Sequence, residues 1–406
     1  MASPPVPPLL PILLCAAALL PACASGNGNV DSPATRDPLF APIDLDQFRG
    51  RPGLLAAVRA TPHAYYRLIN VRFADEVCGM LGAAIPAGPA VNIHGDAHVE
   101  QYSVSAHERG LADFDAATTG PAALDLMRFL VSLRLALHQR GWSADAPAVS
   151  MRFLAGYREA LHAPDVEPPE PVVAQRKHSA MKATTAEWLD RMQLLMRPLD
   201  EQTRGKLDHA RRDYETAMRA QNPALPPGYF DIKKAGLLHM GIGSAFEMKF
   251  LARLEGPSDK ADDDVLIEVK KVPDLSGVRC IQHSSQDDPF RIIAGQTRLG
   301  VGDNALLGYL TIDDKMFYVQ RWRVNYVELS IADFKDSAEL GEVAHDVGNQ
   351  LGRGHPKVLA APHDAQLRRL LQRTVEGHEE ALLDAAEKLE RRVFAAWEAA
   401  RAQGDD

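Results

Sequence analysis

The sequence predicts an α+β fold in which a largely antiparallel sheet is segregated from the helices. Before residue 230, apolar residues recur mostly at helical spacing, whereas residues 232–326 alternate or form short β-branched runs. Beyond residue 340 the helical spacing returns and ends in a long amphipathic helix. This helical, strand-rich, helical order is typical of α+β proteins, because strands that are neighbours in the chain tend to pair.

Local patterns predict the individual elements. Proline disfavours a continuous helix, so the Thr61-Pro62 step divides residues 47–81 into two helices. A short apolar strand is expected at residues 90–93, and further helices are expected at residues 125–141, 148–162 and 186–221. Alternating or β-branched runs predict strands at residues 246–251, 265–269, 307–310 and 316–322.

Composition excludes some classes of protein. The chain has 406 residues, of which 46% are hydrophobic, so it can bury a large core. Its formal net charge is −9. Nucleic-acid binding needs a basic face, so no nucleic-acid partner is expected. A local basic pocket for a phosphorylated ligand remains compatible with this charge.

An apolar segment opens the chain. Residues 9–24 are almost wholly apolar, a run too short to span a bilayer and typical of a secretory signal. The segment Leu20-Pro21-Ala22-Cys23 resembles the lipobox of bacterial lipoproteins, which implies a lipid anchor at Cys23. We therefore expect a lipoprotein on the periplasmic side of the cell envelope. Because no Lys or Arg precedes the apolar run, a cytoplasmic location is the alternative.

Changes in composition divide the chain into five segments. Residues 1–24 are the expected lipoprotein-like signal peptide, and residues 25–46, rich in Pro and Asp, are predicted to be a linker. A helical part that contains the acidic motifs covers residues 47–230. The strand-rich part covers residues 231–330, and C-terminal helices cover residues 331–406.

Four cysteines are present, and two of them lie in the apolar leader. The other two, Cys78 and Cys280, do not have a metal-ligand spacing such as Cys-x-x-Cys, so no zinc site is expected. They could pair in an oxidising compartment, but two buried unpaired thiols are the preferred interpretation.

Two acidic clusters follow predicted strands. His-Gly-Asp-Ala-His occupies residues 94–98, and Asp-Phe-Asp occupies residues 113–115. Phosphoryl transfer to a hydroxyl needs one carboxylate that orients or deprotonates the acceptor and another that holds magnesium against the nucleotide phosphates. The clusters therefore favour a phosphotransferase site over carboxylates that only stabilise loops.

Residues 94–125 resemble the catalytic segment of aminoglycoside phosphotransferases and choline-kinase-like proteins. The pattern of that segment is His-Gly-Asp-x-His-x-x-Asn, then Asp-Trp/Phe-Glu/Asp, then Gly and Asp-Leu. The resemblance implies that Asp96 is the catalytic base, with His94 and His98 in the same catalytic motif. It also implies that Asp125 is a buried carboxylate that braces the catalytic loop.

The same resemblance implies a metal site. Asp113 falls on the magnesium-binding aspartate, and Asp115 follows it in the same acidic segment. Gln101 occupies the position of a metal-binding Asn and offers an amide oxygen on a side chain longer by one methylene. Because magnesium demands near-octahedral geometry, that extra length alters the second metal contact.

A kinase-like site also needs a glycine turn and a strand lysine for the nucleotide phosphates. Gly241, Gly243 and Ser244 form a candidate turn that opens a strand, although such turns more often belong to plain hairpins. Lys270 ends the strand predicted at residues 265–269. We therefore expect ATP or another nucleotide, together with Mg, as cofactors.

The order of these motifs implies a circular permutation. The glycine turn and lysine follow the catalytic motif, and residues 343–355 resemble the helix that normally leads into that motif. The resemblance implies a protein-kinase-like bilobal fold in permuted order, with the C-lobe-like part first, the N-lobe-like sheet next and the remaining C-lobe helices last. Residues 61–381 are similar to the bacterial domain-of-unknown-function family 2252 (DUF2252).

Two departures from the pattern of these related proteins bear on activity. Related sequences tend to have Glu where this chain has Ala294, so Lys270 is left without an obvious ion pair. Glu268 shares a strand face with that lysine but points in parallel. Arg67 and the Arg-Lys-His run at residues 176–178 are candidates for an anionic ligand, against the simpler interpretation of solvated surface charge.

Three functions follow as hypotheses. The first is a phosphotransferase that moves a nucleotide phosphoryl group to an unknown hydroxyl acceptor, either a small molecule or a protein. The alternative is a catalytically inactive kinase-like binding module tethered to the cell envelope, with membrane contact only through Cys23. A metal-dependent hydrolase would leave the glycine turn and Lys270 without a role, so it is the weakest hypothesis.

Overall fold

The computed structural model describes residues 37–238, 242 and 246–403. The expected signal peptide and lipid-anchor cysteine lie outside these residues, as do Gly241, Gly243 and Ser244. The described residues belong to one compact unit that begins at Asp37. This unit is a mixed α+β structure, as the order of the sequence patterns predicts.

Most of the described helices lie before residue 222 or after residue 336, and one, α9, lies within the strand-rich part. Their bounds are α1 (Pro52–Ala60), α2 (Pro62–Leu68), α3 (Asn70–Met80), α4 (Ala123–Gln139), α5 (Ala146–His162), α6 (Val172–Ala180), α7 (Thr185–Met192), α8 (Glu201–Gln221), α9 (Phe290–Leu299), α10 (Ser337–Gly354), α11 (His363–Glu376) and α12 (Glu379–Ala402). None of the described helices is long and apolar enough to cross a membrane.

Two expected helices are interrupted. The second of the two helices predicted within residues 47–81 is divided at Ile69 into α2 and α3. The continuous helix predicted at residues 186–221 is two helices, α7 and α8. Pro198 lies between them, and the Asp200 side chain accepts a hydrogen bond from the backbone N–H of Thr203, which caps the start of α8. A proline followed by a strong N-cap residue ends one helix and begins the next.

The strands form antiparallel sheets throughout the described residues. β1 (Ala90–Ile93) pairs with β4 (Thr118–Pro121), and β2 (Tyr102–Val104) lies between β3 (Arg109–Leu111) and β10 (Val327–Glu328). The largest sheet has five strands in the order β5-β6-β7-β9-β8. Their bounds are β5 (Ile232–Leu237), β6 (Lys249–Leu254), β7 (Val265–Lys271), β8 (Gly308–Ile312) and β9 (Lys315–Arg321).

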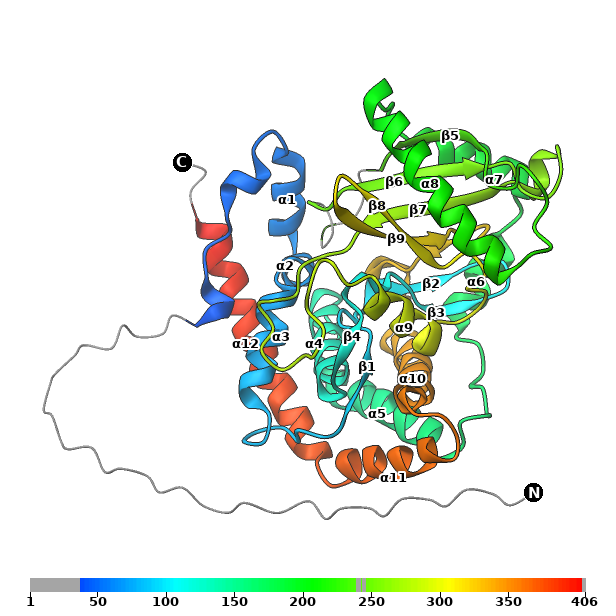
Figure 1. Ribbon diagram of the computed structural model, residues 1–406. Coiled ribbons are helices and arrows are strands. Elements are labelled where there is room, and N and C mark those ends of the chain that lie inside the picture. Colours follow the sequence, from blue (N-terminus) through cyan, green and yellow to red (C-terminus); the bar gives the residue numbers. More distant parts are fainter. Residues whose placement is uncertain (1–36, 239–241, 243–245, 404–406) are drawn as a thin grey trace, which may run out of the picture. The chain divides into compact units, whose positions relative to one another are not determined.

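Alternation along β7 sends its side chains to two different environments. Val265, Ile267 and Val269 pack in a hydrophobic cluster with residues of α8. Glu268 and Lys270 point to the opposite face, because successive side chains on a strand alternate. That face is turned towards the helical part of the chain, while α8 covers the outer side of the sheet (Figure 1).

The helical part is centred on α4, which is buried over most of its length. Helices α5 and α10 pack closely beside it (Figure 1). At Gly348 of α10, an added Cβ atom would lie 2.1 Å from the carbonyl oxygen of Phe153 in α5, so only glycine permits this approach. The close packing fixes α10 against the centre of the helical core.

Residues 37–46 differ from the linker that composition predicts. Leu39 is fully buried, and its carbonyl oxygen accepts a hydrogen bond from Tyr65 Oη. Arg392 of α12 forms an ion pair with Asp37. Apolar residues within the Pro- and Asp-rich run therefore anchor this segment to the helical core.

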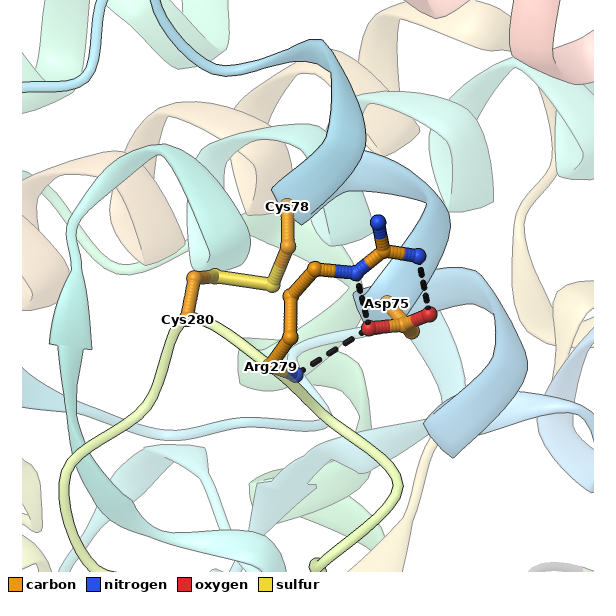
Figure 2. Close-up of a disulfide and its surroundings, with 4 residues drawn as sticks. All are labelled: Asp75, Cys78, Arg279 and Cys280. Atoms are coloured by element: carbon orange, nitrogen blue, oxygen red, sulfur yellow. Dashed lines mark hydrogen bonds and ion pairs between the residues drawn. A yellow bond between two sulfur atoms is a disulfide. The ribbon is translucent and has the colours of Figure 1, made fainter. Parts of the chain in front are cut away.

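Cys78 and Cys280 form a disulfide, so the preferred interpretation of two unpaired thiols is wrong. The bond joins α3 to the loop between β7 and α9, across a sequence separation of 202 residues. Figure 2 shows Arg279 beside it, with its guanidinium group and backbone N–H directed at the carboxylate of Asp75. The pairing is the alternative that the sequence leaves open, because no local pattern shows whether two cysteines so far apart in the chain come within bonding distance.

Candidate active site

A cavity of about 520 Å³, with many charged side chains in its lining, lies where the inner face of the five-stranded sheet meets the helical part. Its size is within the range of small-molecule sites. Residues that the sequence predicts as functional line it from both sides. They are Asp96, His98, Gln101, Asp113, Asp115 and Lys270.

The His-Gly-Asp-Ala-His motif at residues 94–98 is held by Asp125 at the start of α4. Its two carboxylate oxygens accept the backbone N–H groups of His94, at 2.6 Å, and Gly95, at 2.8 Å. Gly95 has a φ of +79°, and a Cβ there would lie 2.1 Å from the carbonyl oxygen of Ala116. Asp125 thus braces the turn, as the family resemblance implies, and the turn requires glycine.

His94 and His98 lie on different sides of this turn. A ring nitrogen of His94 lies 2.9 Å from the carbonyl oxygen of Ala112, so this buried side chain ties the motif to the acidic segment. His98 lines the cavity and is 1% exposed. Burial, reinforced by Arg67, holds the pKa of His98 well below its usual range, so its imidazole is neutral near pH 7.

Asp96 is oriented by a buried arginine. Nε and Nη2 of Arg128 donate to the same oxygen, Oδ1 of Asp96, at 2.9 and 2.7 Å. The guanidinium group lies over the ring of Tyr66, 3.7 Å from its centroid, and donates to the Tyr66 carbonyl. Because Oδ1 holds both hydrogen bonds, Oδ2 of Asp96 is the oxygen available to a ligand.

Lys270 meets both carboxylates of the acidic segment. Its Nζ atom lies 2.7 Å from Oδ1 of Asp113 and 2.5 Å from Oδ2 of Asp115. Asp113 adopts a left-handed backbone conformation, with φ of 56° and ψ of 72°, immediately before the short 3-10 helix at Phe114–Ala116. That conformation is uncommon outside glycine, and here it turns the two carboxylates towards one ammonium group.

The close packing of these charges shifts their pKa values. Burial, followed by the Asp113 charge, raises the pKa of Asp115 to about 6. Burial alone would raise the pKa of Asp113 and lower that of Lys270, but their attraction lowers the pKa of Asp113 and raises that of Lys270 well above its usual range. Burial and the neighbouring Lys270 lower the pKa of Lys249 on the adjacent strand.

The lysine therefore has ion-pair partners, although the sequence suggested none. Its partners come from the helical part, at a separation of 157 residues for Asp113. Glu268 is not a partner: its carboxylate accepts hydrogen bonds from Gln320 and Trp322. Glu268 and Lys270 lie on one face of β7, as predicted, and point in parallel.

Several cavity residues escaped sequence reasoning. Arg128 is a charged residue in a helix with a long apolar face, and it is flanked by Met127 and Phe129, a signal that could have marked it. Lys249 lies directly opposite Lys270 in the β6–β7 register. Gln296 of α9 is 7% exposed and lines the cavity two residues after Ala294. The last two depend on strand register and helix placement, which no local pattern reveals.

The other basic candidates occupy different environments, one in the cavity and the rest away from it. Arg67 lines the cavity and pairs with Glu100 at 3.0 Å. Arg176, Lys177 and His178 instead form ion pairs with acidic residues, which are Glu339, Asp333 and Glu170. These pairs join α6 to neighbouring segments, so that run acts in packing.

The carboxylates fit a metal only together with phosphates. Among the described residues, no three His, Cys, Asp or Glu side chains come close enough to hold a metal ion. Magnesium is commonly bound through one or two carboxylates plus substrate phosphates. Asp113 and Asp115 meet that description, and the buried Gln101 offers an amide oxygen in the same cavity.

The fold and the cavity define a mixed α+β protein in which a strand lysine and carboxylates from the helical part share one polar site. The chain belongs to the family described as "Uncharacterized protein conserved in bacteria (DUF2252)", which matches residues 52–196 and 172–403. The similarity to this family drawn from the sequence is thereby confirmed. No curated protein and no solved structure matches the chain.

Proposed function

We propose that this protein is a kinase-like phosphotransferase that moves a nucleotide phosphoryl group to a hydroxyl acceptor. The observation that carries the proposal is the meeting of Asp96, Asp113 and Lys270 in one cavity. The two aspartates come from the helical part and the lysine from the sheet. A catalytic base, a metal-binding carboxylate and a phosphate-binding lysine are the parts that phosphoryl transfer needs.

Each residue has a distinct role in the proposal. Oδ2 of Asp96 accepts the proton of the acceptor hydroxyl, while Arg128 keeps that carboxylate oriented. Lys270 binds phosphate oxygens. Asp113, Asp115 and Gln101 would hold magnesium, which when bound neutralises charge on the phosphates. Gly241, Gly243 and Ser244 keep their predicted role as the phosphate cover, outside the described residues.

We also propose the permuted kinase-like fold. The lysine is on β7, the third strand of the five-stranded sheet in chain order, and a helix, α9, follows it. Kinase N-lobes have a lysine on their third strand and a helix after it. In addition, His355, at the end of α10, lies 3.2 Å from Asp125, beside the catalytic motif. An unpermuted chain would continue from that helix into the motif.

The alternative is an inactive kinase-like binding module tethered to the cell envelope. Ala294 favours it, because an ordinary kinase pairs its strand lysine with a helix glutamate. The disulfide supports an oxidising compartment, where ATP is scarce. The apolar leader, with its proposed anchor at Cys23, supports the same location.

Nucleotide binding decides between these candidates. We would measure thermal shifts with ATP and GTP, each with magnesium or manganese, for the wild-type domain and for Asp113→Asn. A nucleotide at a hundred times its dissociation constant adds about 2.7 kcal/mol of stability. A metal-dependent shift that disappears in the variant supports phosphoryl transfer. No shift with either nucleotide would reject it in favour of the binding module.

A further inference from the structure

Arg291, near the start of α9, makes hydrogen bonds to both halves of the candidate site. Its Nη1 atom donates to the carbonyl oxygens of Asp115, at 2.9 Å, and Ala117, at 2.7 Å. Its Nη2 atom donates to the carbonyl oxygen of Pro273, at 2.7 Å. Asp115 belongs to the acidic segment, and Pro273 follows the strand that ends just after Lys270.

The surroundings of this guanidinium group argue for more than packing. Arg291 is 4% exposed, and the hydrogen-bond acceptors that the structure gives it are all main-chain carbonyls. A buried cation whose hydrogen bonds go only to neutral groups is a poor source of stability. Its three bonds instead fix the distance between two segments that carry opposite charges.

The rest of α9 is seated against the same loop. At Gly295 an added Cβ would lie 2.5 Å from the Cβ of Ala117, so this helix touches the end of the acidic segment. Gln296, on the next position, lines the cavity. The helix therefore contacts the site through Arg291, Gly295 and Gln296, while Ala294 makes no ion pair with Lys270.

We propose that Arg291 is the positioning residue that holds the Asp113–Asp115 segment against Lys270, in place of the lysine–glutamate pair that Ala294 rules out. By fixing the carbonyls of Asp115 and Ala117, it stabilises the left-handed turn at Asp113 and keeps both carboxylates aimed into the cavity. The functional consequence rests on the proposed nucleotide and metal site. The three hydrogen bonds of Arg291, here called the clamp, do not depend on that site.

Three variants test this role. Arg291→Gln removes the charge and the forked donor, and Arg291→Lys keeps the charge but cannot reproduce three bonds. Arg298→Gln is the matched control, because Arg298 also leaves α9 to reach the core but contacts Asn92 on β1. Hydrogen exchange of residues 111–120 and 270–275 reports the clamp. The dissociation constant of manganese–ATP, compared with that of ATP in chelator, reports the metal site.

We expect Arg291→Gln to speed exchange in both segments and to weaken manganese–ATP binding by about ten- to hundredfold, as loss of a residue that supports metal ligands does. Metal-free ATP binding should change little, and Arg291→Lys should be intermediate. If Arg291→Gln does not fold, the same measurements on Arg291→Lys provide the test. Unchanged exchange in both variants, or an equal effect of Arg298→Gln, would overturn the proposal. Should the wild type bind no nucleotide, the proposed function fails while hydrogen exchange still decides the clamp.

Discussion

Nζ of Lys270 lies 2.7 Å from Oδ1 of Asp113, although 157 residues separate the two in the chain. The strand lysine that the sequence left without a partner is therefore neutralised by the acidic segment of the helical part. One ammonium group stands between two carboxylates, with Asp115 on its other side at 2.5 Å. This contact links the sheet to the acidic segment at residues 113–115 and makes the stability of the fold depend on the residues that line the cavity.

Replacing Lys270 should destabilise the protein. Lys270→Met leaves two neighbouring carboxylates without their buried counter-charge, at a cost of about 3–5 kcal/mol near pH 8. Urea unfolding measures this, with Lys271→Met as the control, because Lys271 is more exposed and lies 3.8 Å from Glu247. Adding Asp115→Asn to Lys270→Met should restore part of the lost free energy of unfolding. Equal effects of the two lysine variants would contradict the buried ion cluster.

Asp115 should make stability fall as pH rises from about 4 to 6. Its pKa is raised from 3.8 to about 6, so the folded state holds this proton more tightly than the unfolded chain does. The stabilising contribution is complete below the unfolded pKa and is lost as pH rises through the folded pKa. The rise in the pKa of Asp115 from 3.8 to about 6 corresponds to about 3 kcal/mol in the free energy of unfolding.

Urea unfolding at a series of pH values checks this contribution. The Asp115→Asn variant should lack the fall between about pH 4 and 6. The lowered pKa of Asp113 acts in the opposite direction and at lower pH, where its contribution is lost as pH falls. A wild-type profile between pH 4 and 6 that superimposes on that of the variant would refute the assignment.

Removing Arg128 should destabilise the protein, because it leaves the buried carboxylate of Asp96 without its counter-charge. Arg128→Met leaves Asp96 without both of its hydrogen bonds, and we expect a loss of about 3–5 kcal/mol. The double variant with Asp96→Asn should regain part of this, because the amide carries no charge. Urea unfolding of the four proteins in this cycle gives the coupling energy. A coupling energy near zero would show that Arg128 does not hold Asp96.

Reduction of the disulfide should lower stability by about 2–5 kcal/mol. The cross-link closes a very long loop, at a sequence separation of 202 between Cys78 and Cys280, so it restricts the unfolded chain strongly. Unfolding with and without dithiothreitol measures this for the wild type. A Cys78→Ser variant should match the reduced protein and be insensitive to the reagent. If dithiothreitol destabilises that variant equally, the effect comes from elsewhere.

Much of the fold could be predicted from local patterns. The strand expected at residues 265–269 is β7, and those expected at residues 307–310 and 316–322 are β8 and β9, which a turn with Asp313 and Asp314 at positive φ connects. The strand expected at residues 90–93 is β1. Such elements depend on alternation and on turn residues, which act over a few positions. The break between α7 and α8 shows where such prediction fails. Helical periodicity continues across residues 186–221, although Pro198 and the N-cap Asp200 divide the segment into two helices.

The sequence by itself determined the class of fold, the order of most of its elements and some of the polar residues that line the cavity, among them Asp96, Asp113 and Lys270. Periodicity and motif spacing are local properties, so one chain read from end to end is enough to find them. Only the tertiary structure decided the pairing of Cys78 with Cys280, of Arg128 with Asp96 and of Lys270 with two aspartates. Those contacts arise because packing of the sheet on the helices brings distant segments together, and no local pattern encodes that geometry.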